Sequence, residues 1–170
     1  MCGFCGCLVA AFEETKLTLI FKLSMVQLIV IGAGQIGSRH LQSLAKIDRE
    51  AQIHVIDTNS SALERARERY DQIPRNNLIK SVKYSSDINE LGCHADVVVV
   101  ATNADVRLDV IETVLHRVRV RYLVLEKVVC QSVEDLRRLS ELLRENGAKA
   151  WVNFSRRMMP FFRNVKQNLG

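Results

Sequence analysis

The segment QLIVIGAGQIGSRH constrains the fold of this chain more than any other part of its sequence. An apolar run leads into three glycines, Gly32, Gly34 and Gly37, spaced as G-x-G-x-x-G, and residues with helical spacing follow them. A second apolar run, IHVI, ends directly before Asp57, about 20 residues beyond the last glycine, as in strand–loop–helix–strand units that bind dinucleotides. Strand, glycines, helix, second strand and acid together predict a site for a nicotinamide or flavin dinucleotide.

Each glycine in this pattern has a physical role. Gly32 lets the chain turn tightly out of the strand, Gly34 leaves room for a pyrophosphate near the backbone, and Gly37 lets the helix pack close to the sheet. The free N–H groups and positive dipole end at the start of the helix, where Gln35 and Ile36 lie, face the phosphates. We therefore expect these five residues to bind the cofactor.

Asp57 determines which cofactor we expect. A carboxylate at this position accepts hydrogen bonds from the adenosine ribose hydroxyls and repels a 2′-phosphate, so the sequence favours NAD over NADP. Thr58 follows the acid and belongs to the same predicted site. The glycine pattern alone leaves open a glycine turn in an α/β protein that binds no nucleotide.

The rest of the chain alternates between apolar runs and segments with helical spacing, which indicates a parallel sheet. The run DVVVVA is almost entirely β-branched, as is typical of a strand covered on both faces. We expect strands at Val26–Ile31, Gln52–Ile56, Val82–Tyr84, Asp96–Ala101, Tyr122–Leu125 and Ala148–Asn153. We expect helices at Gln35–Lys46, from Ser60 or Ser61 to Tyr70, and at Asp87–Leu91, Asp105–His116 and Ser132–Asn146. In the first helix, the residues expected to face the sheet are Ile36, Leu41, Leu44 and Ala45. The predicted fold class is therefore α/β, a doubly wound Rossmann sheet in a three-layer α/β/α arrangement.

Length and composition are those of one ordinary globular domain. The chain has 170 residues, of which 48% are hydrophobic and 25% charged. Its net charge of +5 comes from basic residues scattered through the helical segments, so we expect no nucleic-acid partner. The sequence contains no apolar stretch typical of a signal peptide or a membrane span, and we predict a cytoplasmic protein with no membrane partner.

The first 24 residues differ from the rest, because they hold three of the five cysteines, Cys2, Cys5 and Cys7. A zinc site usually has four ligands, and no further Cys or His follows nearby. We therefore predict no metal site. Residues 1–24 are expected to be an extension that is disordered or lies upstream of a true start at Met25.

Several motifs together resemble the glucose-fructose oxidoreductase / inositol dehydrogenase (Gfo/Idh/MocA) family. The motifs VIGAGQIGSRHLQSL, ATNADVR, LEK and VNFSRRMMPFFRNVK, together with Asp57, occur in the order seen in that family. The resemblance covers about residues 25–170 and implies an NAD(P)-dependent oxidoreductase. In that family the lysine after the fifth strand assists catalysis and touches cofactor and substrate, a role that maps onto Lys127. The resemblance also implies cofactor contacts for Thr102, Asn103, Glu126 and Arg157.

Two residues depart from the pattern of that family. Val128 follows Lys127 where proline is usual, and Asn103 stands where proline is common. Family enzymes also continue into a second α/β domain that supplies most of the substrate pocket, a catalytic His and the usual oligomer interface. We expect that domain to be absent from this chain. The expected division is an extension at 1–24, a dinucleotide-binding domain at 25–152 and the start of a crossover segment at 153–170.

The resemblance implies a parent enzyme that oxidises a secondary alcohol of a sugar, a polyol or a nucleotide-linked sugar, passes hydride to NAD and forms a homo-oligomer. This chain is then its cofactor-binding part, with little or no turnover alone. A second hypothesis is a stand-alone nucleotide-sensing domain of the type that regulates potassium uptake, which shares the glycine loop and acid but needs no Glu-Lys pair after the fifth strand. A methyltransferase is a third option, although its loop usually lacks the third glycine.

Overall fold

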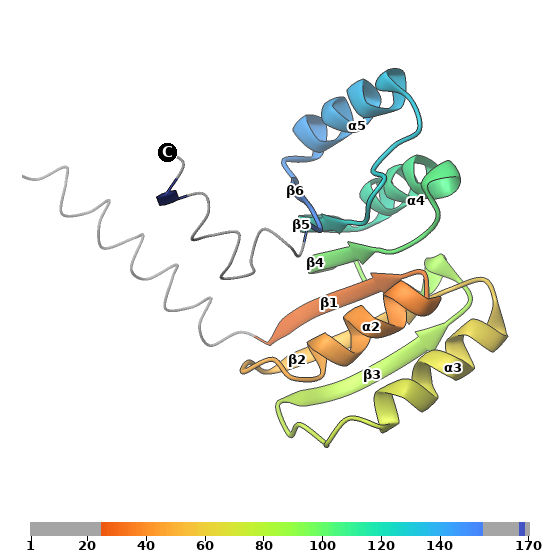
Figure 1. Cartoon of the computed structure of the whole chain (residues 1–170), viewed down its shortest axis with the longest axis vertical. Coiled ribbons are helices and arrows are strands. Elements are labelled where there is room, and N and C mark those ends of the chain that lie inside the picture. The colour runs from red at the N-terminus through yellow and green to blue at the C-terminus, as the bar shows by residue number, and fades with distance from the viewer. Residues whose placement is uncertain (1–24, 155–166, 169–170) are drawn as a thin grey trace, which may run out of the picture.

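A single parallel sheet organises the fold. The computed structural model describes residues 25–154 and 167–168, and its six strands follow the order β3-β2-β1-β4-β5-β6 (Figure 1). The strands are β1 (Val26–Ile31), β2 (Ala51–Ile56), β3 (Ile79–Ser85), β4 (His94–Val100), β5 (Arg119–Leu125) and β6 (Lys149–Val152). Every neighbouring pair runs parallel, which confirms the predicted doubly wound sheet.

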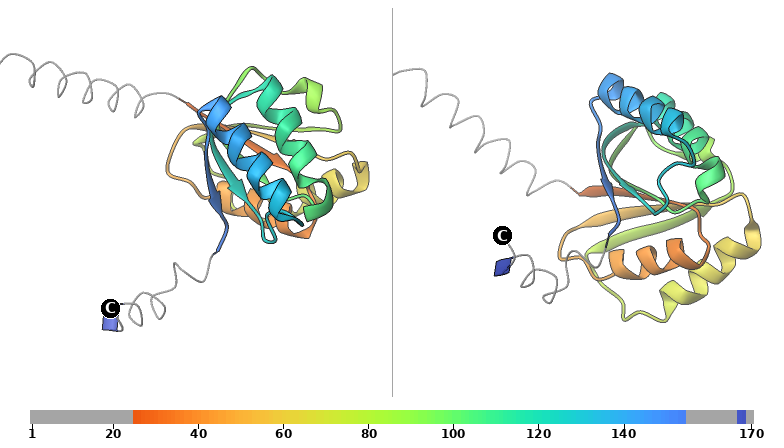
Figure 2. Two further views of the ribbon diagram at one scale, coloured as in Figure 1. Left: turned by 90° about the horizontal axis from the view of Figure 1, so that it is seen from above. Right: turned by 45° about the horizontal axis from the view of Figure 1, so that its top comes forward.

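Helices cover both faces of this sheet. On one face lie α2 (Gln35–Leu44) and α3 (Ser60–Asp71), and on the other lie α4 (Ala104–Arg117) and α5 (Val133–Asn146) (Figure 2). A short 3-10 helix, η1 (Ile88–Glu90), connects β3 to β4. This arrangement confirms the three predicted layers. Among residues 25–154 and 167–168, no helix is long and apolar enough to cross a membrane.

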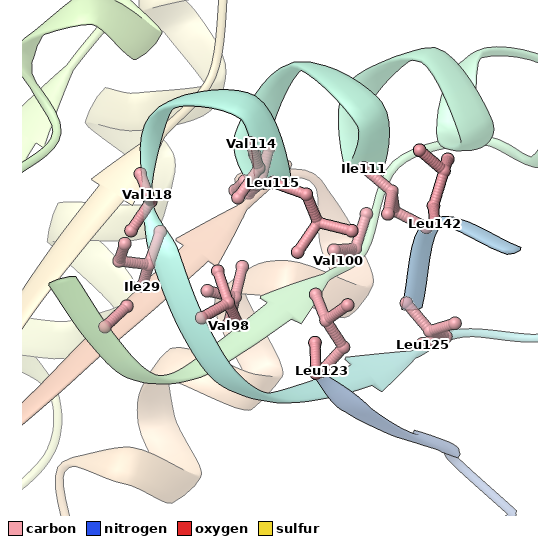
Figure 3. Close-up of a cluster of buried hydrophobic side chains, with 14 of the residues drawn as sticks. Ile29, Val98, Val100, Ile111, Val114, Leu115, Val118, Leu123, Leu125 and Leu142 are labelled. Atoms are coloured by element: carbon pink, nitrogen blue, oxygen red, sulfur yellow. The ribbon is translucent and has the colours of Figure 1, made fainter. Parts of the chain in front are cut away.

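Two apolar clusters fill the space between sheet and helices. One lies under α4 and α5 and joins Ile111 and Val114 of α4 to Val98 and Leu123 of the strands, all fully buried (Figure 3). The other lies under α2 and α3 and includes the fully buried Leu41. β4 contributes side chains to both clusters, so its β-branched run is covered on both faces, as the sequence predicts.

The strand order reverses at β1. From β1 the chain moves outward to β2 and β3 and then returns to β4 on the other side of β1. The helices that follow β1 and β4 therefore leave towards opposite faces of the sheet (Figure 2). Such a switch point, beyond the carboxyl ends of the strands, is where open α/β sheets bind their ligands.

The strand boundaries differ from expectation mainly at the edge of the sheet. The sequence predicts only Val82–Tyr84 as the third strand, whereas β3 spans Ile79–Ser85. The exposed Lys80 and Lys83 interrupt the apolar pattern of this edge strand, although the backbone ladder with β2 continues past them. β5 also begins before its predicted start, at Arg119.

Two predictions about the helices are wrong. The cap of α3 is Asn59, whose side chain accepts a hydrogen bond from the backbone N–H of Ser61 at 3.0 Å, rather than Ser60 or Ser61. Ile36 does not face the sheet, since it is 48% exposed while Leu41 of the same helix is fully buried. The helix buries Gly37, Ser38 and Leu41 instead, so Ile36 lies on its outer side.

Candidate cofactor site

Two of the three glycines are fixed by close packing at the carboxyl ends of β1 and β4. Gly32 has φ +89°, in the left-handed region, and a Cβ added to it would lie 2.9 Å from the carbonyl carbon of Ala101. A Cβ on Gly37 would lie 1.7 Å from the carbonyl oxygen of Gly32. A side chain at either position would displace backbone, so the loop takes this shape only with glycine there.

Gly34 differs from the other two glycines, because a Cβ added to it would meet no atom of the described residues within 4 Å. It is the N-cap residue of α2, and the helix has no side-chain cap. The first N–H groups of α2, around Gln35 and Ile36, are therefore not satisfied by a capping side chain. Open space beside such N–H groups, at the positive end of a helix, fits a pyrophosphate.

Asp57 ties the end of β2 to the glycine loop. Its carboxylate accepts hydrogen bonds from the backbone N–H of Ala33, at 2.6 Å, and from that of Asn59, at 2.8 Å. The first of these bonds crosses from the second strand to the loop that follows the first. The acid predicted to bind the ribose thus lies beside the loop predicted to bind the phosphates.

A cavity of about 610 Å³ lies between the carboxyl ends of β1 to β4 and the start of α4. Its lining mixes apolar side chains with polar loop residues and includes Ile31, Ile56, Val106, Val110, Asp57, Thr58 and Thr102. The hydroxyl oxygen of Thr102 is buried and has no hydrogen-bond partner among the described residues, so it is available to a ligand. This volume and mixture of groups are typical of sites for small molecules and cofactors, and the residues present fit a dinucleotide.

Lys127 also lies at the carboxyl end of the sheet, two residues after the end of β5 at Leu125. Its ammonium group is 5.0 Å from the centre of the Phe154 ring, a cation–π distance. Thr102 and Asn103 follow β4, the strand next to β5 in the sheet. The structure therefore brings these predicted residues together on the β4–β5 side of the switch point, and Thr102 also lines the cavity that contains Asp57.

The side chain of Glu126 joins three elements of the fold. Its Oε1 atom lies 2.7 Å from Nε2 of His40 on α2 and also accepts a hydrogen bond from the side chain of Asn153, which follows β6. Only 13% of the Glu126 side chain is exposed. Burial raises the pKa of this carboxyl, but the hydrogen bonds from Asn153 and His40 outweigh burial, and the pKa is lowered overall. Glu126 is therefore a carboxylate at neutral pH.

Arg107 on α4 is almost completely buried, with 2% of its surface exposed. Its guanidinium donates hydrogen bonds to the backbone carbonyl of Glu126, at 2.7 Å, and to those of Thr102 and Val128. It thereby ties the residues after β4 to the turn after β5, in which the peptide bond between Lys127 and Val128 is cis. Burial lowers the pKa of Arg107, but a guanidinium stays protonated in proteins.

Sequence reasoning assigned no partner to His40 and no role to Arg107. His40 stands at the end of the glycine segment QLIVIGAGQIGSRH, but its partner Glu126 lies 86 residues further along the chain. Arg107 does carry a signal, because it stands one helical turn before Ile111, on the face of α4 that is otherwise apolar. An isolated arginine in the inner register of a helix indicates a buried cation. Arg157, predicted to lie near the cofactor, is outside the described residues, as are the three N-terminal cysteines.

The fold and its glycine loop place this chain in the class of dinucleotide-binding Rossmann domains. Its family follows from residues 26–154, which match the family described as "Oxidoreductase family, NAD-binding Rossmann fold" (GFO_IDH_MocA). The chain belongs to this family, as its motifs predict, and the predicted cofactor, NAD, is confirmed. A comparison with curated protein sequences gives no match.

Solved structures share this fold at low sequence identity. An oxidoreductase from Agrobacterium radiobacter, in complex with NAD+, L-tartaric acid and magnesium, is 18% identical with a TM-score of 0.66, over 86% of this chain and 40% of that chain. Myo-inositol 2-dehydrogenase from Lactobacillus plantarum is 13% identical with a TM-score of 0.66, over 86% and 41% of the two chains. The WlbA dehydrogenase from Chromobacterium violaceum, in complex with NADH and UDP-GlcNAcA, is 17% identical with a TM-score of 0.63, over 78% and 36%. The chain thus spans about two fifths of the length of these proteins.

Proposed function

We propose that this protein binds NAD as the cofactor domain of an oxidoreductase that oxidises a secondary alcohol of a sugar, a polyol or a nucleotide-linked sugar. The observation that carries the proposal is the position of Lys127. It lies at the carboxyl end of the sheet, as the glycine loop does, but on the opposite side of the switch point from Asp57. Family membership favours an oxidoreductase domain over a sensor that regulates potassium uptake. The similar structures include a myo-inositol dehydrogenase and a dehydrogenase in complex with UDP-GlcNAcA.

In this proposal the loops that follow β1 and β2, at the carboxyl end of the sheet, bind the adenosine and phosphate part of the cofactor. Asp57, with Thr58 beside it, accepts hydrogen bonds from the ribose hydroxyls, and its charge disfavours the 2′-phosphate of NADP. The open backbone at Gly34 and the first turn of α2, with Gln35 and Ile36, hold the pyrophosphate. The exposure of Ile36, which the core does not explain, suits a residue that covers a bound ligand.

The β4–β5 side holds the reacting end. NAD supplies the hydride acceptor when it is bound. Thr102 and Asn103 line the nicotinamide side, and Lys127 assists removal of the proton from the substrate hydroxyl. Because the chain spans about two fifths of its structural neighbours, the groups that orient the substrate are assigned to the rest of a parent enzyme. Residues 1–170 alone should then bind the cofactor with little or no turnover.

The same proposal assigns the remaining segments. Residues 25–152 form the dinucleotide-binding domain, 1–24 form an extension, and 153–170 begin a crossover to a second domain, with Arg157 near the cofactor. The parent enzyme would assemble as a homo-oligomer through that second domain.

Calorimetric titration of the full chain with NADH, NADPH, ATP and S-adenosylmethionine tests the proposal. We expect NADH to bind roughly tenfold or more tightly than NADPH, since like charges about 4 Å apart near a protein surface repel by about 1 to 4 kcal/mol. Equal affinities would contradict the role of Asp57. Binding of ATP without NADH would favour the sensor, and binding of S-adenosylmethionine alone would favour a methyltransferase.

A further inference from the structure

The carboxylate of Glu126 is held by other groups of the protein. Its Oε1 atom is hydrogen-bonded both to His40 and to Asn153, and the side chain is mostly buried. These three residues, which we call the Glu126 cluster, come from α2, the turn after β5 and the segment after β6. The orientation of the carboxylate is therefore fixed from two other elements of the fold.

The turn that carries Lys127 is held from its other side as well. Arg107 donates to the backbone carbonyls of Glu126 and Val128, the residues on either side of Lys127. The Phe154 ring lies 5.0 Å from the Lys127 ammonium group, one residue beyond Asn153 of the cluster. The backbone of the turn is thus held from α4, the preceding side chain from α2 and the segment after β6, and the ammonium group from that same segment.

Holding α2, the turn after β5 and the segment after β6 together does not by itself require a buried carboxylate. Burying a carboxylate is unfavourable unless hydrogen bonds replace its water, and well-packed apolar residues often connect elements at least as stably. The carboxylate stands directly before the lysine proposed to take part in catalysis, and its partners come from α2 and from the segment after β6 rather than from its own turn. A role in positioning Lys127 explains why the carboxylate stands beside the lysine and why its unfavourable burial is kept.

We propose that His40, Glu126 and Asn153 are positioning residues that fix the turn carrying Lys127. The inference rests on the proposed function, because it assigns Lys127 to the reacting end of the cofactor. It gives Glu126 a role through the turn, in addition to the cofactor contact that the family resemblance implied.

A double-mutant cycle on the full chain tests whether His40 acts through Glu126. The variants are His40→Ala, Glu126→Ala and the double variant, each titrated with NADH and with ADP-ribose, which lacks the nicotinamide. Each single change should weaken NADH binding by about three- to tenfold, and the double variant should be no weaker than Glu126→Ala, because coupled residues are not additive. Affinity for ADP-ribose should stay within about twofold, since its contacts lie on the β1–β2 side.

Glu112→Ala is the matched control for this cycle. Its carboxylate also pairs across elements, with Arg138 at 2.5 Å, but between α4 and α5 and away from the turn. This variant should leave both affinities unchanged. Additive losses in the double variant, or equal losses of NADH and ADP-ribose affinity, would overturn the positioning role.

Hydrogen exchange without cofactor separates this inference from the proposed function. Exchange of the backbone amides from Lys127 to Val129 should rise at least severalfold in His40→Ala and Glu126→Ala but not in Glu112→Ala. His40→Gln, which keeps a donor for the carboxylate, should restore slow exchange. If the unmodified chain binds neither NADH nor ADP-ribose, the proposed function fails, while the exchange rates still decide the positioning role. Unchanged exchange in both alanine variants would disprove it.

Discussion

The two sides of the switch point build their sites by different means. On the β1–β2 side the site is made of backbone: Gly37 packs against Gly32, and Asp57 accepts a hydrogen bond from the loop itself. On the β4–β6 side the turn that carries Lys127 is held by side chains from other elements, of which Arg107 is the most deeply buried. The β1–β2 side is thus built by backbone packing in and around one loop. The β4–β6 side, which we call the assembled side, is built by side chains from several elements.

This difference determines what each side tolerates. A loop shaped by backbone packing depends on the absence of side chains at a few positions, so it fails abruptly when a Cβ is added. A turn held by several side chains loses one contact at a time, so changes there should reduce stability or affinity in steps. Four substitutions test this contrast.

The largest effect is expected for Gly37→Ala. The added Cβ would lie 1.7 Å from the carbonyl oxygen of Gly32, so the loop and α2 must separate. We expect the free energy of unfolding to fall by about 4 kcal/mol or more, or the chain not to fold. Urea denaturation followed by circular dichroism measures this.

Gly34→Ala is the matched control, because its Cβ would meet nothing within 4 Å in the part of the chain that the structure describes. Its stability should change by less than about 1 kcal/mol. The larger Gly34→Val should fold as well but lose NADH binding, as the side chain would fill the space assigned to the pyrophosphate. Similar stability losses for Gly37→Ala and Gly34→Ala would remove the distinction between the two glycines.

Arg107→Met should have the next largest effect. The change keeps an apolar stem but removes the buried guanidinium that donates to the carbonyls of Thr102, Glu126 and Val128. We expect a loss of about 2 to 4 kcal/mol in the free energy of unfolding, as several hydrogen bonds from a charged donor are lost together. Arg138→Met, on the partly exposed surface of α5, is the control and should change stability much less. If both variants unfold at the same urea concentration, Arg107 does not hold the two turns together.

The same contrast explains which features the sequence predicts. Apolar periodicity and the glycine spacing depend on nearby residues, and they predicted the parallel sheet, its layers and the loop around Gly34. The bounds of the edge strand β3 were harder to predict. Its exposed Lys80 and Lys83 interrupt the apolar pattern, and only the pairing with β2 makes them part of a strand. Ile36 was placed in the core because helical spacing does not say where the sheet ends.

The assembled side of the site was predicted by residue type but not by contact. Lys127 and Glu126 were identified from the family motif, yet the partners of Glu126 depend on how α2 and β6 meet the end of β5. No spacing rule connects residues 86 positions apart, as His40 and Glu126 are. Arg107 was visible as a misfit in an apolar helix face, but its carbonyl partners follow only from the three-dimensional arrangement.

Asp57→Asn should act on affinity more than on stability. The amide keeps one oxygen that can accept from the N–H of Ala33, so the loop stays closed, but the negative charge and the hydrogen bond from the N–H of Asn59 are lost. We expect the preference for NADH over NADPH to fall by about tenfold, in line with loss of a repulsion of about 1 to 2 kcal/mol. Calorimetry with both cofactors measures this. Asp135→Asn, at an acid in the first turn of α5, should leave the preference unchanged, and an unchanged preference in Asp57→Asn would place the discrimination elsewhere.

The smallest effect is expected in the pH dependence contributed by Glu126. Its folded pKa is lowered below the ordinary 4.5, so the ionised form stabilises the fold above about that pH. This contribution should disappear as the pH falls through the folded pKa. In Glu126→Gln the contribution is absent at every pH, so the wild type should be more stable by about 1 kcal/mol at neutral pH. The gap should narrow below about pH 4.5. Thermal unfolding of both proteins across this range measures the gap. A difference in stability that stays constant with pH would mean that packing rather than the charge of Glu126 holds the cluster. The assembled side would then resemble the side built of backbone more closely than its hydrogen bonds indicate.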